Sequence, residues 1–101
     1  MHYVLIDWVH DEIDEPAHIY SELDQDRREV RRVEFYTNGL CFSCGAERGN
    51  LDALRREPFP TDLRELCTEE GMTAHAITPM LFYEVWSQAQ ERPDGFMNMF
   101  F

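Results

Sequence analysis

REVRRVEFYTNGLCFSC, residues 28–44, is the stretch that most constrains the fold. Its first part, residues 28–36, is rich in β-branched and aromatic residues and predicts a strand. Asn38 and Gly39 follow, and this pair favours a tight type I′ turn because both central positions of that turn need a positive φ. The stretch therefore predicts an antiparallel hairpin that turns at Asn38 and Gly39.

The expected register bears on the Cys-x-x-Cys motif of this hairpin. With the turn at Asn-Gly, Val33 lies opposite Cys44 and Tyr36 lies opposite Cys41, so that apolar side chains match across the ladder. Residues three apart in a regular strand point to opposite faces, which keeps the two sulfurs from sharing a zinc ion or a disulfide. We interpret both cysteines as semi-buried structural thiols.

A structural zinc site stays open as an alternative, since Gly45 follows the motif and could break the strand. Zinc takes about four ligands, and the further candidates are Cys67 and His75, with His2, His10 and His18 in addition. Whether Cys41, Cys44, Cys67 and His75 bind zinc is not decided by their spacing. Thioredoxin-like chemistry is disfavoured because that motif opens a helix. We expect no cofactor, no metal and no catalytic residue.

The length and the charge of the chain indicate one small acidic domain. The chain has 101 residues with 20 acidic and nine basic side chains, a net charge of −11. We expect a single domain over residues 1–101 with one modest core. No run reaches the roughly 18 apolar residues of a membrane span, and the first residues lack the basic region of a signal peptide, so a cytoplasmic protein is expected. The charge disfavours binding to nucleic acid or membranes and favours a basic protein partner.

Two further strands are predicted before the hairpin. Residues 3–10 alternate between two mostly apolar faces, which indicates a central strand, and residues 17–23 form a shorter one. Residues 51–57 fit either a strand or a helical turn. The expected fold is α+β, an antiparallel sheet of four to five strands with two helices on one face.

The two helices are expected in the second half of the chain. Thr61 is a candidate cap for a short helix over residues 62–67, and Thr78 caps a clearer helix that has Pro79 at its first position. The apolar tail, residues 94–101, is expected to pack back as a last strand or to dock in a partner.

Carboxylates concentrate between residues 11 and 26, which hold seven acidic side chains and no basic one. Four arginines follow at positions 27, 28, 31 and 32. These arginines are expected to pair with the acids across the strands, with an anion site as the alternative. Because four arginines cannot neutralise every acid, we predict a partner-binding surface; the alternative is a solvated acidic face that serves solubility alone. The expected residues of the partner-binding surface are Asp11, Asp14, Glu15, Glu22, Asp24 and Asp26.

The order of these motifs resembles an uncharacterised family of small bacterial domains of unknown function, over roughly residues 3–86. The matching residues are Trp8, His10 and Asp11; Asp14, Glu15 and Pro16; Tyr20, Ser21, Glu22, Leu23 and Asp24; Glu29, Val30, Arg31, Val33 and Glu34; Gly39; Pro58, Phe59 and Pro60; and Val85 and Trp86. The cysteines are not part of this pattern. The resemblance implies no established activity and therefore no catalytic residue.

Charge and resemblance together lead to a functional prediction. Some small acidic bacterial domains look like immunity proteins of toxin systems, and we predict a non-catalytic protein-binding module of this inhibitor or immunity type. Its partner would be a basic toxin or a nucleic-acid-binding protein. The alternative is a small enzyme that uses His10 with neighbouring carboxylates, because an imidazole beside an acid can exchange protons near neutral pH.

Overall fold

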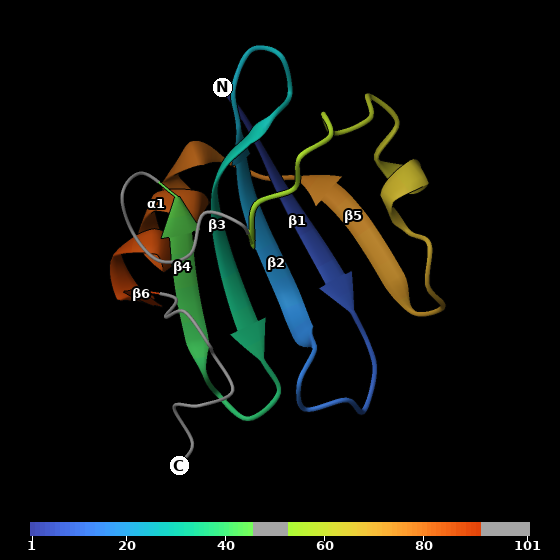
Figure 1. The fold of residues 1–101 in the computed structure, drawn as a ribbon, viewed down its shortest axis with the longest axis vertical. Coiled ribbons are helices and arrows are strands. Elements are labelled where there is room, and N and C mark those ends of the chain that lie inside the picture. Colours follow the sequence, from blue (N-terminus) through green and yellow to red (C-terminus); the bar gives the residue numbers. More distant parts are fainter. Residues whose placement is uncertain (46–52, 92–101) are drawn as a thin grey trace.

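The computed structural model describes residues 1–45 and 53–91, which form a curved sheet (Figure 1). Its strands are β1 (His2–Trp8), β2 (Pro16–Leu23), β3 (Glu29–Tyr36), β4 (Cys41–Gly45), β5 (Met72–Ala76) and β6 (Gln90–Glu91). The order is β5-β1-β2-β3-β4-β6, and the first five strands are antiparallel, as predicted. The two-residue β6 adds a parallel pairing to β4.

Strand β1 lies between β5 and β2 and has apolar side chains on both faces. Tyr3 belongs to a cluster with Val33 and Phe82 on one face of the sheet. Val4 and Ile6 point to the other face, where they pack with a second cluster. Since both faces of β1 are apolar, both must be covered, and this explains why the rest of the chain divides between them.

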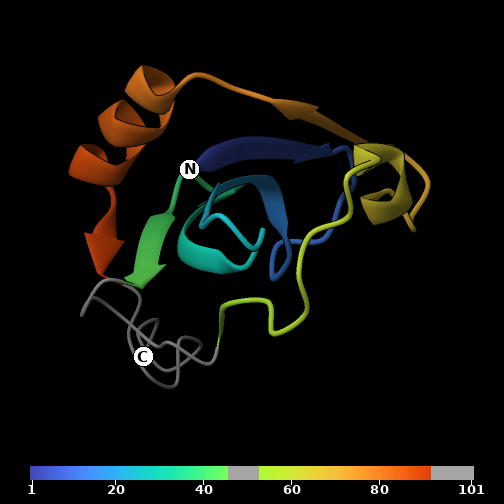
Figure 2. The ribbon, with the colours of Figure 1, turned by 90° about the horizontal axis from the view of Figure 1, so that it is seen from above.

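One α-helix and one short 3-10 turn cover these faces. Helix α1 (Pro79–Gln88) is capped by Thr78 as predicted and packs on the Tyr3 face. The 3-10 turn η2 (Leu63–Leu66) packs on the opposite face (Figure 2), and its cap is Asp62. The expectation of two helices on one face is therefore wrong, as is the expected Thr61 cap. No helix within the described residues is long and apolar enough to cross a membrane.

The hairpin forms between β3 and β4, but its turn is one residue longer than predicted. Tyr36 and Leu40 flank a loop of residues 37–39, in which the amide of Gly39 donates to the Tyr36 carbonyl at 3.0 Å. Gly39 has φ of 90°, whereas Asn38 does not have a positive φ. Asn38 instead accepts a bond from the Leu40 amide through its side chain. This pattern is that of a type I turn followed by a glycine bulge.

The longer turn shifts the register by one residue. Cys41 lies opposite Phe35, and Cys44 lies opposite Arg32 in place of Val33. Cys41 therefore joins the cluster under α1, and Cys44 is buried on the other face. The exact pairing was wrong, but the two cysteines do point to opposite faces of β4.

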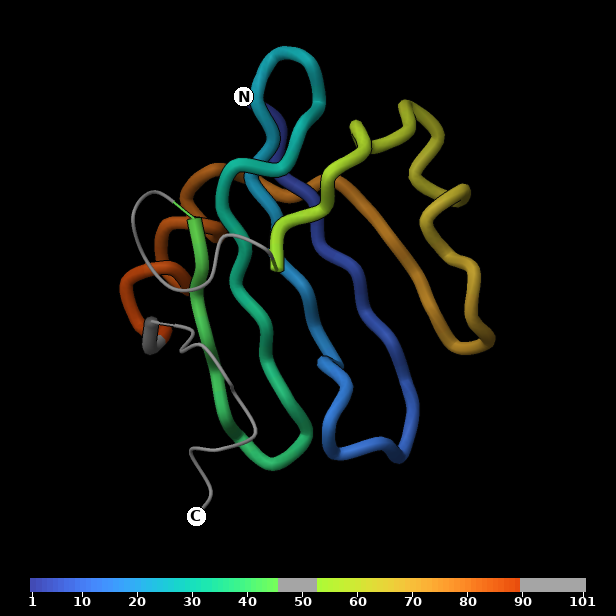
Figure 3. The backbone as a smooth tube through the Cα atoms, viewed as in Figure 1, coloured from blue at the N-terminus to red at the C-terminus, as the bar shows by residue number. Residues whose placement is uncertain are grey.

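Strand β5 was not predicted from the sequence. It pairs with β1 at the edge of the sheet (Figure 3). Most of its residues are exposed. Residues 53–57, which fitted a strand or a turn, contain no strand. The apolar tail at 94–101 lies outside the described residues.

Candidate functional site

The acidic residues proposed for partner binding lie at two opposite ends of the sheet. Asp11, Asp14 and Glu15 lie in the loop between β1 and β2, whereas Asp24 and Asp26 lie in the loop between β2 and β3 (Figure 3). The eight residues of β2 separate them by about 25 Å. The acidic run is therefore not one continuous surface.

Glu22 differs from the other five acids because its side chain is buried. Arg31 donates two hydrogen bonds to its carboxylate at 2.5 and 2.6 Å, and the Tyr3 hydroxyl donates a third at 2.8 Å. Burial opposes ionisation, but the bonds from Arg31 and Tyr3 outweigh it and hold the pKa of the Glu22 carboxyl below its ordinary value. Glu22 is a structural ion-pair partner and is not presented to other molecules.

The same ion pair attaches α1 to the sheet. The Arg31 guanidinium lies 4.9–5.3 Å from the ring centroids of Phe82, Tyr83 and Trp86, all on α1. Cation–π contacts of this kind are attractive, more so where water is excluded. Arg31 thus connects a carboxylate of β2 to the aromatic face of the helix.

The other arginines of the cluster have different partners from those expected. Arg32 donates to Glu29 and Glu34 of its own strand, and all three side chains are largely buried. Arg27 and Arg28 donate to backbone carbonyls. Cross-strand pairing with the acidic segment is therefore correct for Arg31 alone among the described contacts.

The loop between β1 and β2 presents aliphatic side chains among its acids. Val9 is 82% exposed and Ile13 is 70% exposed. The amide of Val9 bonds to the Gly71 carbonyl, which brings Glu69 and Glu70 to the same end of the sheet. We call this surface the acidic end; its residues are Val9, Asp11, Glu12, Ile13, Asp14, Glu15, Glu69 and Glu70. The sequence does not indicate that Glu69 and Glu70 belong to this surface, because their position depends on the pairing of β5 with β1.

His10 holds this loop in place. One ring nitrogen, Nδ1, accepts a hydrogen bond from the Glu12 amide, while Nε2 lies 2.9 Å from the Pro16 carbonyl. Because Nδ1 accepts, Nε2 must carry the proton and donate. The ring also packs against Trp8 with a centroid separation of 4.3 Å. Both nitrogens are engaged in holding the loop, so this geometry favours a structural role over proton transfer.

Replacing His10 with phenylalanine should therefore loosen the loop while it keeps the contact with Trp8. Loss of two hydrogen bonds should cost about 1–3 kcal/mol of the free energy of unfolding. Amide hydrogen exchange at Glu12 should accelerate while that at Tyr20 in β2 stays slow. Equal protection of Glu12 in both proteins would contradict the anchoring role.

A second imidazole pairs with a carboxylate on the exposed part of the α1 face. His18 Nδ1 lies 2.6 Å from Asp7 Oδ1 across β1 and β2. Half of the His18 side chain is exposed, and such solvent-accessible pairs contribute little to stability. Asp7 and His18 are 11 residues apart in sequence, and only the register of β1 and β2 brings them together, so their spacing gives no signal for this pair.

The cysteines and His75 do not assemble into a metal centre. Cys41, Cys44 and Cys67 are not in disulfides, and Cys67 lies beyond η2, outside the hairpin. Within residues 1–45 and 53–91, no group of three or more potential ligands is close enough to hold a metal ion. Burial raises the pKa of the Cys41 thiol to about 11.

That pKa predicts slow alkylation of Cys41. The thiolate is the reactive form, so at pH 8 iodoacetamide should modify Cys41 roughly a hundredfold more slowly than a thiol with the ordinary pKa of 9.0. Peptide mass spectrometry over time, with the urea-unfolded protein as control, measures this rate. Similar rates in the folded and unfolded protein would contradict the burial of this thiol.

The fold and these contacts define a small acidic α+β domain with one sheet end rich in carboxylates. The chain belongs to the family described as Domain of unknown function (DUF6881), whose model matches residues 2–91. The resemblance to an uncharacterised domain family is thereby confirmed. None of the curated proteins and none of the solved structures matches the chain.

Proposed function

We propose that this protein is a non-catalytic binding module whose acidic end docks a basic protein partner. The observation that carries this proposal is the exposure of Val9 and Ile13 in a loop whose acidic side chains are also exposed. Protein interfaces combine an apolar centre with a polar rim, and the acidic end has both parts. Complementary charge on the partner would raise the rate of association.

Hydrogen bonds within the protein also hold this loop. His10 bonds to the middle of the loop at Glu12 and to its end at Pro16, and Val9 bonds to Gly71. A preorganised loop loses less conformational entropy on binding, which favours affinity. Asp24 and Asp26 lie at the other end of the sheet, and the Asp24 carboxylate accepts bonds from the amides of Asp26 and Arg28. We therefore leave these two acids and Glu22 out of the proposed surface.

The partner class follows from the charge of the surface. A toxin nuclease or another nucleic-acid-binding protein carries a basic cleft for phosphates, and a surface rich in carboxylates would compete for that cleft. The protein would then act as an inhibitor of the immunity type, in the cytoplasm. The alternative, an enzyme that uses His10, is less well supported because both nitrogens of His10 hold the loop.

Charge reversal at the acidic end tests this proposal. Extracts of the native host are passed over immobilised wild-type protein and over an Asp14→Lys, Glu15→Lys variant, and basic proteins are quantified by mass spectrometry. A specific partner should be retained by the wild type, should be lost from the variant, and should elute as salt rises because exposed charge pairs are screened.

A matched variant separates location from net charge. Glu65→Lys, Glu84→Lys changes the charge by the same amount at exposed positions on η2 and α1. This control should retain the partner as the wild type does. If both double variants lose the partner equally, the interaction depends on net charge alone and the acidic end is not the binding surface.

A further inference from the structure

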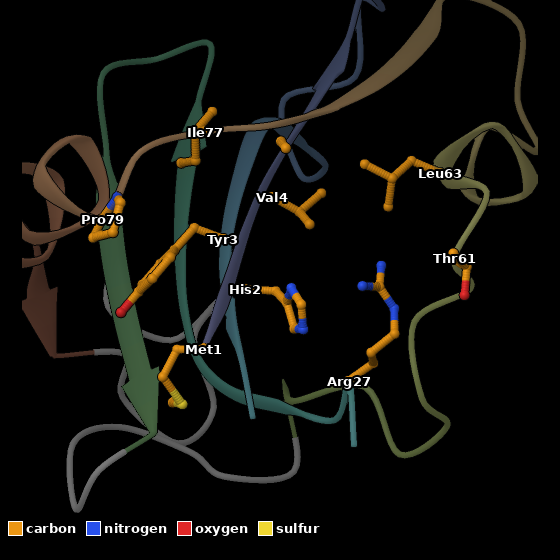
Figure 4. A pocket seen from close by; sticks show the side chains of 10 residues that line it. Met1, His2, Tyr3, Val4, Arg27, Thr61, Leu63, Ile77 and Pro79 are labelled. Carbon is orange, nitrogen blue, oxygen red and sulfur yellow. The ribbon is translucent and has the colours of Figure 1, made fainter. Parts of the chain in front are cut away.

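A pocket of about 340 Å³ lies at the opposite end of the sheet from the acidic end, beside the start of β1 (Figure 4). Its lining includes His2 and Val4 of β1, Arg27, Thr61, Leu63 and Ala76. The side chains of His2, Arg27 and Leu63 face the same space between β1 and residues 61–63. The pocket therefore combines apolar walls with the guanidinium of Arg27, the imidazole of His2 and the hydroxyl of Thr61.

Arg27 is fixed in this pocket by the backbone around it. Its Nε and Nη2 donate to the carbonyls of Phe59 and Pro60 at 3.1 and 2.9 Å, and its own carbonyl accepts a bond from the Phe59 amide. Its φ is 64°, a conformation that non-glycine residues seldom adopt and that is often found at functional sites. The guanidinium is thus half-buried and already oriented.

This arginine also lacks a neutralising carboxylate. Arg31, Arg32, Arg55 and Arg64 each form an ion pair, but across residues 1–45 and 53–91 no acidic side chain pairs with Arg27. Arg28 and Arg56 also form no ion pair within the described residues, but of these three arginines it is Arg27 that lines the pocket.

Two carboxylates close to Arg27 in the fold or sequence are engaged elsewhere, and no ion pair joins the adjacent, exposed Asp26 to Arg27. Asp62, next to Thr61, forms two bonds with Arg64, and Asp24 accepts bonds from amides of its own loop. Because none of these three acids pairs with Arg27, its positive charge stays available to a ligand in the pocket that its side chain faces (Figure 4).

From these observations we infer that the pocket binds a small organic anion, a carboxylate that carries an apolar group. The carboxylate would accept hydrogen bonds from Arg27, with His2 and Thr61 as further donors. The apolar group would pack on Val4 and Leu63. Guanidinium–carboxylate bonds are among the stronger hydrogen bonds in proteins, which suits recognition by a single arginine.

Titration with phenylacetate tests this inference, with phenylacetamide as the neutral analogue of the same shape. The full chain, tagged at its C-terminal end, is followed by ¹H–¹⁵N NMR. Phenylacetate should bind saturably and shift the amides of His2, Val4 and Ala76. Phenylacetamide should bind about tenfold more weakly or not at all. Inorganic phosphate, which has charge but no apolar group, should also bind more weakly than phenylacetate.

Two variants locate the site. Arg27→Gln should weaken phenylacetate binding about tenfold, whereas Arg28→Gln, its exposed neighbour, should leave it unchanged. Because Arg27 also holds the chain near Phe59, a second variant fills the pocket without removing a native contact: Ala76→Phe should abolish binding while the remaining amide shifts keep their native positions.

Four results would overturn the inference. These are the absence of saturable phenylacetate binding, equal binding of phenylacetamide, equal binding of inorganic phosphate, and unchanged phenylacetate binding in a folded Ala76→Phe protein. None of them bears on the acidic end, so failure here leaves the proposed partner surface to its own test.

Discussion

Replacing Arg31 with alanine is expected to lower the free energy of unfolding by about 3–5 kcal/mol. The Glu22 carboxylate would remain buried without the two hydrogen bonds that now compensate its charge. The helix would also lose the cation that its aromatic side chains surround. Urea denaturation followed by tryptophan fluorescence measures the loss, and Trp86 reports directly on the helix.

The neighbouring arginine is the matched control for this substitution. Arg28 is exposed and its guanidinium bonds to the Arg56 carbonyl, so Arg28→Ala should cost less than about 1 kcal/mol. A double variant that replaces Arg31 with Met and Glu22 with Leu should recover much of the lost stability, since it removes both charges together. If Arg31→Ala costs no more than Arg28→Ala, the ion pair does not attach α1 as we describe.

The same pair predicts a dependence of stability on pH. The pKa of Glu22 is lowered in the folded protein, so ionised Glu22 stabilises the fold above its unfolded-state value of 4.5. This contribution is lost as the pH falls through the lower folded-state pKa. Glu22→Gln should therefore be less stable than the wild type at pH 7, and the difference should shrink towards pH 3.

Gly45→Ala is expected to be about as damaging, at about 3–5 kcal/mol. Gly45 ends β4 with φ of 101°, which disfavours any side chain. A Cβ at this position would lie 2.2 Å from the Val30 carbonyl oxygen and 2.9 Å from the Arg31 Cα. Both are backbone atoms of β3, so the two strands would have to separate where Arg31 is positioned.

The other two positive-φ glycines complete a graded series for this prediction. Gly39→Ala meets no atom within 4 Å and should cost only the conformational strain, about 1–2 kcal/mol. Gly71→Ala would place its Cβ 2.7 Å from the Val9 carbonyl oxygen and should fall between the two. Thermal unfolding of the three variants gives the order, and a loss at Gly39 equal to that at Gly45 would contradict the close approach of β3 and β4.

Local patterns predicted the elements that depend on neighbours in sequence. The alternation in residues 3–10 predicted a central strand, and Thr78 with Pro79 predicted the start of α1. The hairpin was predicted, but its register was off by one. Asn38-Gly39 suits both a two-residue turn and a three-residue loop with a glycine bulge, and the sequence does not distinguish them.

The site was harder to predict because it depends on residues far apart in sequence. In the sequence, the acids of residues 11–26 suggest one surface. In the fold, strand β2 separates the two ends of this segment, and Glu22 is buried in an ion pair with Arg31. In the sequence, Arg27 is one of four similar arginines. In the fold, hydrogen bonds to the carbonyls of Phe59 and Pro60 position its side chain.

The sequence by itself determined a small acidic α+β domain, its antiparallel hairpin and its capped helix, because strand alternation, turn residues and caps act over a few neighbouring residues. Only the tertiary structure decided which charges are buried and which are presented. The exposure of each charge depends on β5 packing beside β1, on α1 packing over Arg31 and on residues 59–63 packing beside Arg27. These segments are far apart in sequence, and their packing determines how far each charge is removed from water.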